Sequence, residues 1–355
     1  MVNKAHPFCP ECETFALKAE MHNKGCKRCG TDFILKSVKM SKSYGNTVDP
    51  IGIMNKYGAD AARLFILFGA SPKSGLEWSD EGVDFAFKFV KNTFKLLIES
   101  PDIIRDKKII RDTLIEYYLN KTIKKVSEAL EKISIRDAIN EIIQFTSELN
   151  RYKSEGVYKD VFDQCKENLT LLLHPLVPHM TEEVWEHMGK SGFLSLAIWP
   201  IYDKNILSVE NEYKWNLMNN TVDSINHIIQ IIKKEKLNEI LIIIADEWKF
   251  DLMLKLLSLV EKSKDQGEII GKLRENKEFK TKGNFISQTV IKVLKNLGRY
   301  VKSPINAIDE FNFFFEIKNI YEKKYKCKVS VIPENESQEK KAAQGLPGKP
   351  AIIIK

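Results

Sequence analysis

Two groups of residues near the start of the chain have types and spacing that could do chemistry. The first is the decapeptide "SVKMSKSYGN" at residues 37–46, in which Lys39 and Lys42 flank a Met-Ser pair. The stretch has neither helical nor strand periodicity, so a loop is predicted. Two interpretations are open for the ten residues alone: a solvated surface loop, or a loop whose ammonium groups take part in a reaction.

The second group is a set of four cysteines, Cys9, Cys12, Cys26 and Cys29, spaced as C-x2-C, thirteen residues, and C-x2-C. Each C-x2-C turn presents two thiolates to one side, and two such turns complete the tetrahedral sulfur shell that suits Zn²⁺. A redox dithiol pair is the alternative. The spacing favours a structural zinc site with an architectural role.

Length and composition limit the class of protein. The 355 residues are enough for two or three domains, and 43% hydrophobic with 29% charged residues is typical of a soluble protein. No apolar run of about 18 residues suggests a membrane span, and the N-terminus lacks the apolar segment of a signal peptide. We therefore expect a cytoplasmic protein with no membrane partner.

The charge balance leaves nucleic-acid binding open. Fifty-five basic residues against 48 acidic residues give a formal charge of +7. This mild excess indicates a nucleic-acid partner only if basic residues gather on one face.

The pattern along the chain predicts a multidomain α+β protein. Asp49 is expected to cap a helix that starts at Pro50 and ends at Gly58. Consecutive amphipathic helices from about residue 81 to 200 predict an antiparallel bundle, including one that starts with a capping box at Ser134 and Asp137. Ile139, Ile142, Phe145 and Leu149 recur along that helix at the spacing of one apolar face.

After the bundle, three β-rich segments predict a small α+β domain with a mixed sheet. They are "EILIIIADEW" at 239–248, "KCKVSVI" at 326–332 and the terminal "KPAIIIK". The predicted domains are a zinc ribbon at 1–35, a loop with connecting helices of a catalytic core at 36–80, the bundle at 81–210, and the α+β domain at 211–355.

Several stretches, in order, resemble one enzyme family. "KMSKS" at residues 39–43 matches the second signature of the class I aminoacyl-tRNA synthetases, and "GNTVDP" and "YGADAARLFILF" resemble the stretch after that signature in the Leu/Ile/Val group. "LEWSDEGV" is similar to the leucyl members, and "LLLHPLVPHMTEEVW" to the end of the anticodon-binding bundle. "ADEWKF" and "LPGKPAIIIK" resemble archaeal leucyl enzymes. The chain thus resembles the C-terminal portion of a leucyl-tRNA synthetase.

This resemblance assigns a role to the lysine loop. Leucine activation displaces pyrophosphate from Mg²⁺-bound ATP, and lysines on a mobile loop can meet the charge on the β- and γ-phosphates as it develops. Lys39 and Lys42 are the implied catalytic residues, and Lys42 matters most. The implied nucleotide-binding residues are Lys39, Met40, Ser41, Lys42 and Ser43. Gly45 lets the loop bend, and Asn46 is taken as structural.

The first signature of the family is missing. None of the six histidines forms an H-x-G-H motif, whose histidines would hold ATP phosphates at a helix N-terminus. The leucine pocket and the editing domain belong to the same absent region. One explanation is a split enzyme, in which this chain is a β-subunit that needs a separate N-terminal half; a truncated product and a retained fragment are others. We expect the isolated chain to be inactive.

The resemblance also implies tRNA(Leu) as a partner, and one basic face is a candidate contact. In "VIKVLKNLGRYVK", four basic residues are spaced three, four and three apart: Lys292, Lys295, Arg299 and Lys302. A solvated basic face is the alternative. A second hypothesis for the whole chain is a non-catalytic, zinc-stabilised tRNA-binding module, which would have no need of phosphate-contacting lysines.

Overall fold

The computed structural model describes residues 2–20, 23–69, 75–233, 236–295, 297, 300 and 303–355. The chain divides into two compact units, which are described separately. Unit 1 comprises Met1–Asp106 and Tyr118–Asp203, and unit 2 comprises Lys107–Tyr117 and Lys204–Lys355. Among the helices of the described ranges, none is long and apolar enough to cross a membrane.

Unit 1 consists of a small sheet followed by helices. Its elements are β1 (Val2–Cys9), β2 (Thr14–Phe15), η1 (Lys18–Glu20), β3 (Ile34–Lys39), α1 (Pro50–Tyr57), α2 (Ala59–Gly69), β4 (Leu76–Glu77), α3 (Asp80–Ile98), β5 (Ile104–Arg105), the greater part of α4 (Ile110–Glu131), α5 (Ile135–Glu155), β6 (Val157–Tyr158), α6 (Lys159–Leu173), α7 (Pro178–His187) and η2 (Leu194–Leu196).

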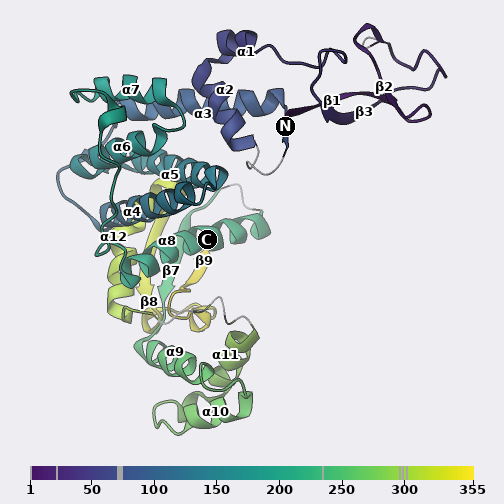
Figure 1. The fold of residues 1–355 in the computed structure, drawn as a ribbon. Coiled ribbons are helices and arrows are strands. Elements are labelled where there is room, and N and C mark those ends of the chain that lie inside the picture. Colours follow the sequence, from purple (N-terminus) through teal and green to yellow (C-terminus); the bar gives the residue numbers. More distant parts are fainter. Residues whose placement is uncertain are drawn as a thin grey trace. The chain divides into compact units, whose positions relative to one another are not determined.

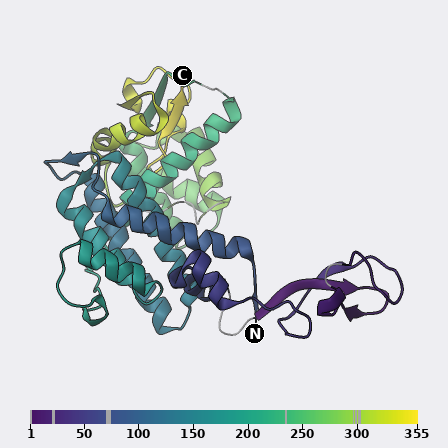
Figure 2. The same cartoon turned by 90° about the horizontal axis from the view of Figure 1, so that it is seen from above.

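The sheet of unit 1 has the strand order β2-β1-β3, and β4 pairs with β1 in parallel. β1 and β3 are antiparallel, with a register that runs from Phe8 opposite Ile34 to Asn3 opposite Lys39. We call β1, β2 and β3 with their connecting turns the ribbon. The turns with the cysteines lie at one end of the ribbon, and the lysine loop leaves β3 at the other (Figures 1 and 2).

Local sequence signals explain where the first helices begin and end. The Asp49 carboxylate accepts hydrogen bonds from two backbone N–H groups at the start of α1, and Gly58 ends that helix with φ of 83°, which confirms both predictions. Ser79 caps α3. The predicted capping box at Ser134 is wrong: Ser134 precedes α5, but its side chain makes no capping hydrogen bond, because the Asp137 N–H bonds the Ser134 carbonyl instead.

The helices of unit 1 pack through the apolar stripes that their periodicity indicates. α5 buries Ile139, Ile142, Phe145 and Leu149, as predicted. Short two-residue strands, β5 and β6, interrupt the otherwise helical region and pair with each other in parallel.

Unit 2 contains the three predicted strands in one sheet, flanked in the sequence by helices. Its elements are the first turns of α4, then α8 (Val209–Ile232), β7 (Glu239–Ile244), α9 (Glu247–Val260), α10 (Gln266–Arg274), η3 (Lys280–Lys282), α11 (Gly283–Lys295), α12 (Ala307–Tyr325), β8 (Lys328–Pro333), η5 (Glu334–Glu336), η6 (Ala342–Gln344) and β9 (Ala351–Ile354). β7 is central, parallel to β8 and antiparallel to β9, so the sheet is mixed as predicted.

A buried lysine ties the C-terminal segment to α9. Lys249 is 1% exposed, and its Nζ lies 2.7 Å from a Glu334 carboxylate oxygen. It also donates to the carbonyls of Ala343 at 2.7 Å and Gly345 at 3.0 Å. Burial lowers the pKa of Lys249, while these partners compensate for the lost hydration of its charge.

Candidate functional site

The lysine loop begins where β3 ends. Lys39 is the last residue of β3, and the Met40 N–H donates to the Val2 carbonyl at 3.1 Å, which attaches the start of the loop to β1. The side chains of Lys39 and Lys42 are exposed, and Met40 is half-buried. Neither ammonium group forms an ion pair with any residue in the described ranges. Both charges are therefore available to a ligand.

Backbone and side-chain hydrogen bonds close the loop into a turn. The Gly45 N–H, at φ of 72°, lies 3.1 Å from the Ser41 carbonyl and 3.2 Å from the Lys42 carbonyl. The Asn46 Oδ1 accepts from the Ser41 N–H at 2.8 Å, and the Ser41 and Ser43 hydroxyls are 2.7 Å apart. Asn46 is 2% exposed, so it fixes the turn from inside, in agreement with the structural role expected for it.

After this turn the chain folds back onto the ribbon. The Ser43 carbonyl accepts from the Lys18 N–H at 3.3 Å. The Tyr44 ring lies 5.4 Å from the His6 ring and 5.7 Å from the Phe15 ring, centroid to centroid. Sequence reasoning missed His6 and Tyr44. Two features of the sequence could have indicated this contact. Tyr44 is an aromatic residue directly after the signature, and His6 lies two positions from Phe8 on a strand.

The four cysteines converge at the other end of the ribbon. Their sulfur atoms all lie within 4.8 Å of one another, with Cys9 to Cys29 at 3.5 Å and Cys12 to Cys26 at 3.9 Å. A tetrahedral site with Zn–S bonds of about 2.3 Å requires sulfur atoms about 3.8 Å apart. The observed distances lie on both sides of this value, so the sulfur set fits a tetrahedral metal ion.

Backbone hydrogen bonds form the two turns that carry these cysteines. The Cys12 N–H donates to the Cys9 sulfur at 3.4 Å, and the Gly30 N–H donates to the Cys26 carbonyl at 2.8 Å, with Gly30 at φ of 77°. The contact with Thr31 lowers the pKa of Cys29 to about 6, whereas hydrogen bonding with Cys29 raises the pKa of Cys12 to about 12. A metal ion that binds these sulfurs must displace the remaining thiol protons.

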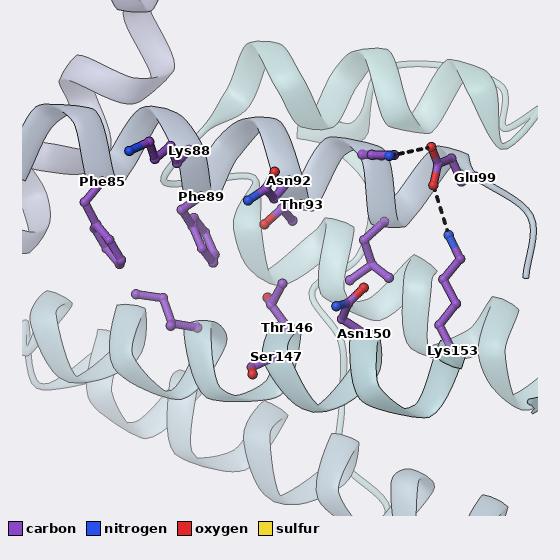
Figure 3. A pocket seen from close by; sticks show the side chains of 13 residues that line it. Phe85, Lys88, Phe89, Asn92, Thr93, Glu99, Thr146, Ser147, Asn150 and Lys153 are labelled. Carbon is purple, nitrogen blue, oxygen red and sulfur yellow. Dashed lines mark hydrogen bonds and ion pairs between the residues drawn. The ribbon is translucent and has the colours of Figure 1, made fainter. Parts of the chain in front are cut away.

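A separate groove of about 500 Å³ lies between α3 and α5 in unit 1. Figure 3 shows Phe85, Phe89 and Asn92 on α3 facing Ser147 and Asn150 on α5. Thr93 also lines the groove; it is 1% exposed, and its hydroxyl has no hydrogen-bond partner among the described residues.

Charged residues close one end of this groove. Glu99 lies 3.5 Å from Lys95 and 3.3 Å from Lys153, so one carboxylate joins the two walls (Figure 3). The groove therefore combines aromatic faces, amide and hydroxyl groups and a net positive charge.

The predicted basic face of the C-terminal region is described in part. Lys292 and Lys295 lie on α11 and are exposed, whereas Arg299 and Lys302 lie outside the described residues. The buried stripe of α11 consists of Ile286, Val290 and Val293.

Two families match the chain in sequence. Residues 33–79, which include the lysine loop, α1 and α2, match the family described as tRNA synthetases class I (I, L, M and V). Residues 112–246 match the anticodon-binding domain of tRNA ligase.

Relatives of known name are leucine–tRNA ligases. That of Fusobacterium nucleatum is 33% identical over 199 residues, 52% of this chain and 23% of that protein. That of Pyrococcus furiosus is 29% identical over 336 residues, 90% of this chain and 33% of that protein. The LeuRS–tRNA–LeuAMS ternary complex of Agrobacterium radiobacter K84 aligns with a TM-score of 0.43 and 23% identity over 59% of this chain and 24% of that chain.

The chain thus spans between about a quarter and a third of the length of the curated relatives it matches. The archaeal relative matches nine-tenths of the chain, and the two families follow each other along the sequence in the predicted order. In sequence, the chain therefore corresponds to a C-terminal portion of the leucyl-tRNA synthetases.

Proposed function

We propose that this chain supplies the KMSKS loop of a leucine–tRNA ligase. In this reaction the carboxylate of leucine attacks the α-phosphate of Mg²⁺-bound ATP, and the bond to the leaving pyrophosphate breaks. Lys39 and Lys42 contact the β- and γ-phosphates, whose negative charge they stabilise most in the transition state. The observation that carries the proposal is a pair of exposed lysines that have no ion-pair partner among the described residues. Lys39 ends β3 and Lys42 lies in the closed turn that follows, in the segment similar to class I synthetases.

The loop geometry gives each part of the segment a role. Lys42 lies between the two serines whose hydroxyls are 2.7 Å apart, so its backbone is confined while its side chain stays free. Ser41 and Ser43 offer further donors to phosphate oxygens. Met40 lies half-buried at the junction with β3, where it anchors the start of the loop.

An N-terminal synthetase half is the second part of the proposal. It would bring the H-x-G-H motif, the leucine pocket and the editing domain. Large apolar side chains on the ribbon and on α1 are exposed in this chain, and a partner would cover them. They are Leu17 (54% exposed), Ile34 (52%), Leu35 (74%), Ile51 (63%) and Met54 (43%).

Zn²⁺ is the metal that we assign to Cys9, Cys12, Cys26 and Cys29. Four sulfur ligands leave no open coordination position, so the ion would cross-link the ribbon and take no part in the reaction. The near-tetrahedral sulfur distances support this assignment.

tRNA(Leu) is the proposed macromolecular substrate. Two surfaces support it: the groove between α3 and α5, whose phenyl rings and amides suit unpaired bases, and the exposed lysines Lys292 and Lys295 on α11, which suit phosphates. Replacing Lys292 and Lys295 with glutamine should weaken tRNA binding and flatten its salt dependence, whereas Asn150→Ala should weaken binding without changing the salt slope.

The decisive experiment is leucine-dependent ATP–pyrophosphate exchange. We expect no exchange with the chain alone, and exchange after a matching N-terminal half is added. Lys42→Ala in that mixture should lower the rate by about a hundredfold or more, the size of effect seen when one charge-stabilising donor is lost. Lys91→Ala, which removes an exposed lysine on α3, is the matched control and should leave the rate unchanged.

A mixture that shows no exchange tests the proposal only when the two halves are folded and associated. In that case the catalytic proposal is wrong, and the second candidate, a zinc-stabilised tRNA-binding module or fragment, takes its place. Exchange that survives Lys42→Ala would instead remove the lysine loop from the mechanism.

A further inference from the structure

A continuous set of ring contacts links the ribbon to the lysine loop. Phe8 lies opposite Phe15 in the β1–β2 register, and their ring centroids are 4.9 Å apart. Tyr44 then lies 5.7 Å from Phe15 and 5.4 Å from His6. His6 and Phe8 are two positions apart on β1, so they share one face of the sheet. The residue that follows the signature thus rests on the face of the strand that ends in Cys9.

His6 is held firmly beneath Tyr44. It is 0% exposed, and its Nε2 lies 2.6 Å from the Ala16 carbonyl, so an Nε2–H donor is the tautomer that satisfies this oxygen. Its Nδ1 has no hydrogen-bond partner among the described residues. Burying a polar nitrogen without a hydrogen bond costs folding free energy. An apolar side chain at this position of the strand would avoid that cost.

Both ends of this contact set depend on the cysteine turns. Cys9 is the last residue of β1, directly after Phe8, and Cys12 is two residues before β2, which carries Phe15. A metal ion on these sulfurs fixes the distance between β1 and β2, and therefore the spacing of the rings on which Tyr44 rests. The Lys18 N–H contact with Ser43 lies on the same segment after β2.

We propose that Tyr44, resting on His6 and Phe15, couples metal binding at the four cysteines to the position of Lys42. Tyr44 and His6 are positioning residues in this scheme, since they contact the loop and not the reacting atoms. When the ribbon is loaded, the turn at residues 41–45 is held against β1 and β2. When the metal ion is removed, the turn detaches and Lys42 loses its fixed starting position. The importance of Lys42 rests on the proposed function, but the coupling itself does not.

The coupling can be measured without any synthetase activity. Trypsin cleaves after Lys42, so its rate of cleavage at the Lys42–Ser43 bond reports how often the turn opens. In the zinc-loaded full chain we expect slow cleavage, and removal of zinc with a chelator should raise the rate by about tenfold or more. Tyr44→Ala should raise it similarly while one zinc ion per chain is retained, and Tyr44→Phe, which keeps the ring, should behave as the original chain.

Hydrogen exchange of the 40–46 peptide is a second measure of how often the turn opens, and it does not depend on how trypsin recognises Tyr44. The decisive comparison is chelation in the Tyr44→Ala background, which should have little further effect on the loop because the link is already broken. Equal acceleration by chelation in both backgrounds would overturn the proposal, as would unchanged loop protection in zinc-loaded Tyr44→Ala. Cleavage at Lys249 in unit 2, which is 1% exposed, is the control for general unfolding. Loss of ATP–pyrophosphate exchange alone would bear on the proposed function and not on the coupling.

Discussion

The two sheets of this chain are stabilised in different ways. In the ribbon, five of the six residues of β3 are exposed, so this strand has almost no apolar burial to hold it. In unit 2, five of the six residues of β7 are buried, and Leu241 and Ile243 belong to a hydrophobic cluster. The ribbon therefore has to rely on its sulfur cluster and one aromatic face, whereas the sheet of unit 2 is stabilised by apolar burial.

The difference suggests a division of roles. A sheet without a hydrophobic core can be ordered or released by one ligand, which suits an element that carries the loop to which we assign a catalytic role. A buried sheet keeps its geometry under all conditions in which the unit is folded. A change that removes the metal ion or the apolar burial should therefore affect one of the two sheets and leave the other unchanged.

Removal of one sulfur ligand should give the largest effect. Cys26→Ser should abolish zinc binding, and because structural zinc contributes about 10–16 kcal/mol of apparent binding free energy, the ribbon should lose its order completely. Metal analysis should fall from one zinc per chain to none, and amides of β1 and β3 should exchange freely. Those of β7 should keep their protection.

Cys327→Ser, in unit 2, is the matched control and should retain the metal ion. A Cys26→Ser chain that still protects β1 would show that the ribbon is stable by its own packing, and the contrast between the sheets would then be wrong.

The sequence predicted those features whose chemistry is local. The residues of each C-x2-C pair and of the KMSKS segment are neighbours in the sequence, so their spacing alone identifies them. The caps at Asp49 and Gly58 likewise involve backbone groups only a few residues away. Contacts across the sheet could not be predicted in this way. His6 and Tyr44 are 38 positions apart in the chain, and they meet because β3 pairs with β1 and the loop after β3 folds back onto the ribbon.

Buried charges in unit 2 were missed for the same reason. Glu310 lies in the first turn of α12, where acidic residues are common and usually solvated. It is 0% exposed here, and Tyr213 and Gly348, both distant in sequence, donate to the same carboxylate oxygen at 3.2 and 3.0 Å. Its other oxygen has no partner among the described residues.

Glu310 should make the stability of unit 2 depend on pH. Burial raises the pKa of Glu310 from 4.5 to about 7. The folded state then binds the proton more tightly than the unfolded state, so stability falls as pH rises from about 4.5 to about 7 and is constant above. The loss is about 3 kcal/mol, at about 1.4 kcal/mol for each pKa unit. Pulse-labelled hydrogen exchange in urea, read on α12 peptides at pH 5 and pH 8, would measure it.

Glu310→Gln should remove this dependence, because a neutral amide keeps an oxygen for Tyr213 and Gly348 and does not titrate. Glu275→Gln, which replaces an exposed carboxylate in the same unit, should retain the slope of the original chain. Identical slopes in the Glu310→Gln and original chains would refute the assignment.

The smallest predicted effect compares two aspartate caps that are chemically alike. Asp49 accepts from the N–H groups of Ile51 and Gly52, both at 3.1 Å, and Asp265 accepts from the Glu268 N–H at 2.7 Å. Replacing either with alanine should cost about 1 kcal/mol. The consequences should differ, because α1 has no buried residue while α10 buries two apolar side chains.

In α1, a loss of about 1 kcal/mol is comparable to the whole local stability of a short helix without packing, so Asp49→Ala should leave its amides nearly unprotected. In α10, Asp265→Ala should lower protection only about fivefold, since burial of Ile269 and Leu273 keeps the helix in place. Hydrogen exchange on the two helices measures both, and Asp49→Ser, which keeps a capping oxygen, should restore α1. Equal losses in the two helices would show that α1 depends on its cap no more than α10 does, and the comparison of the two caps would then be wrong.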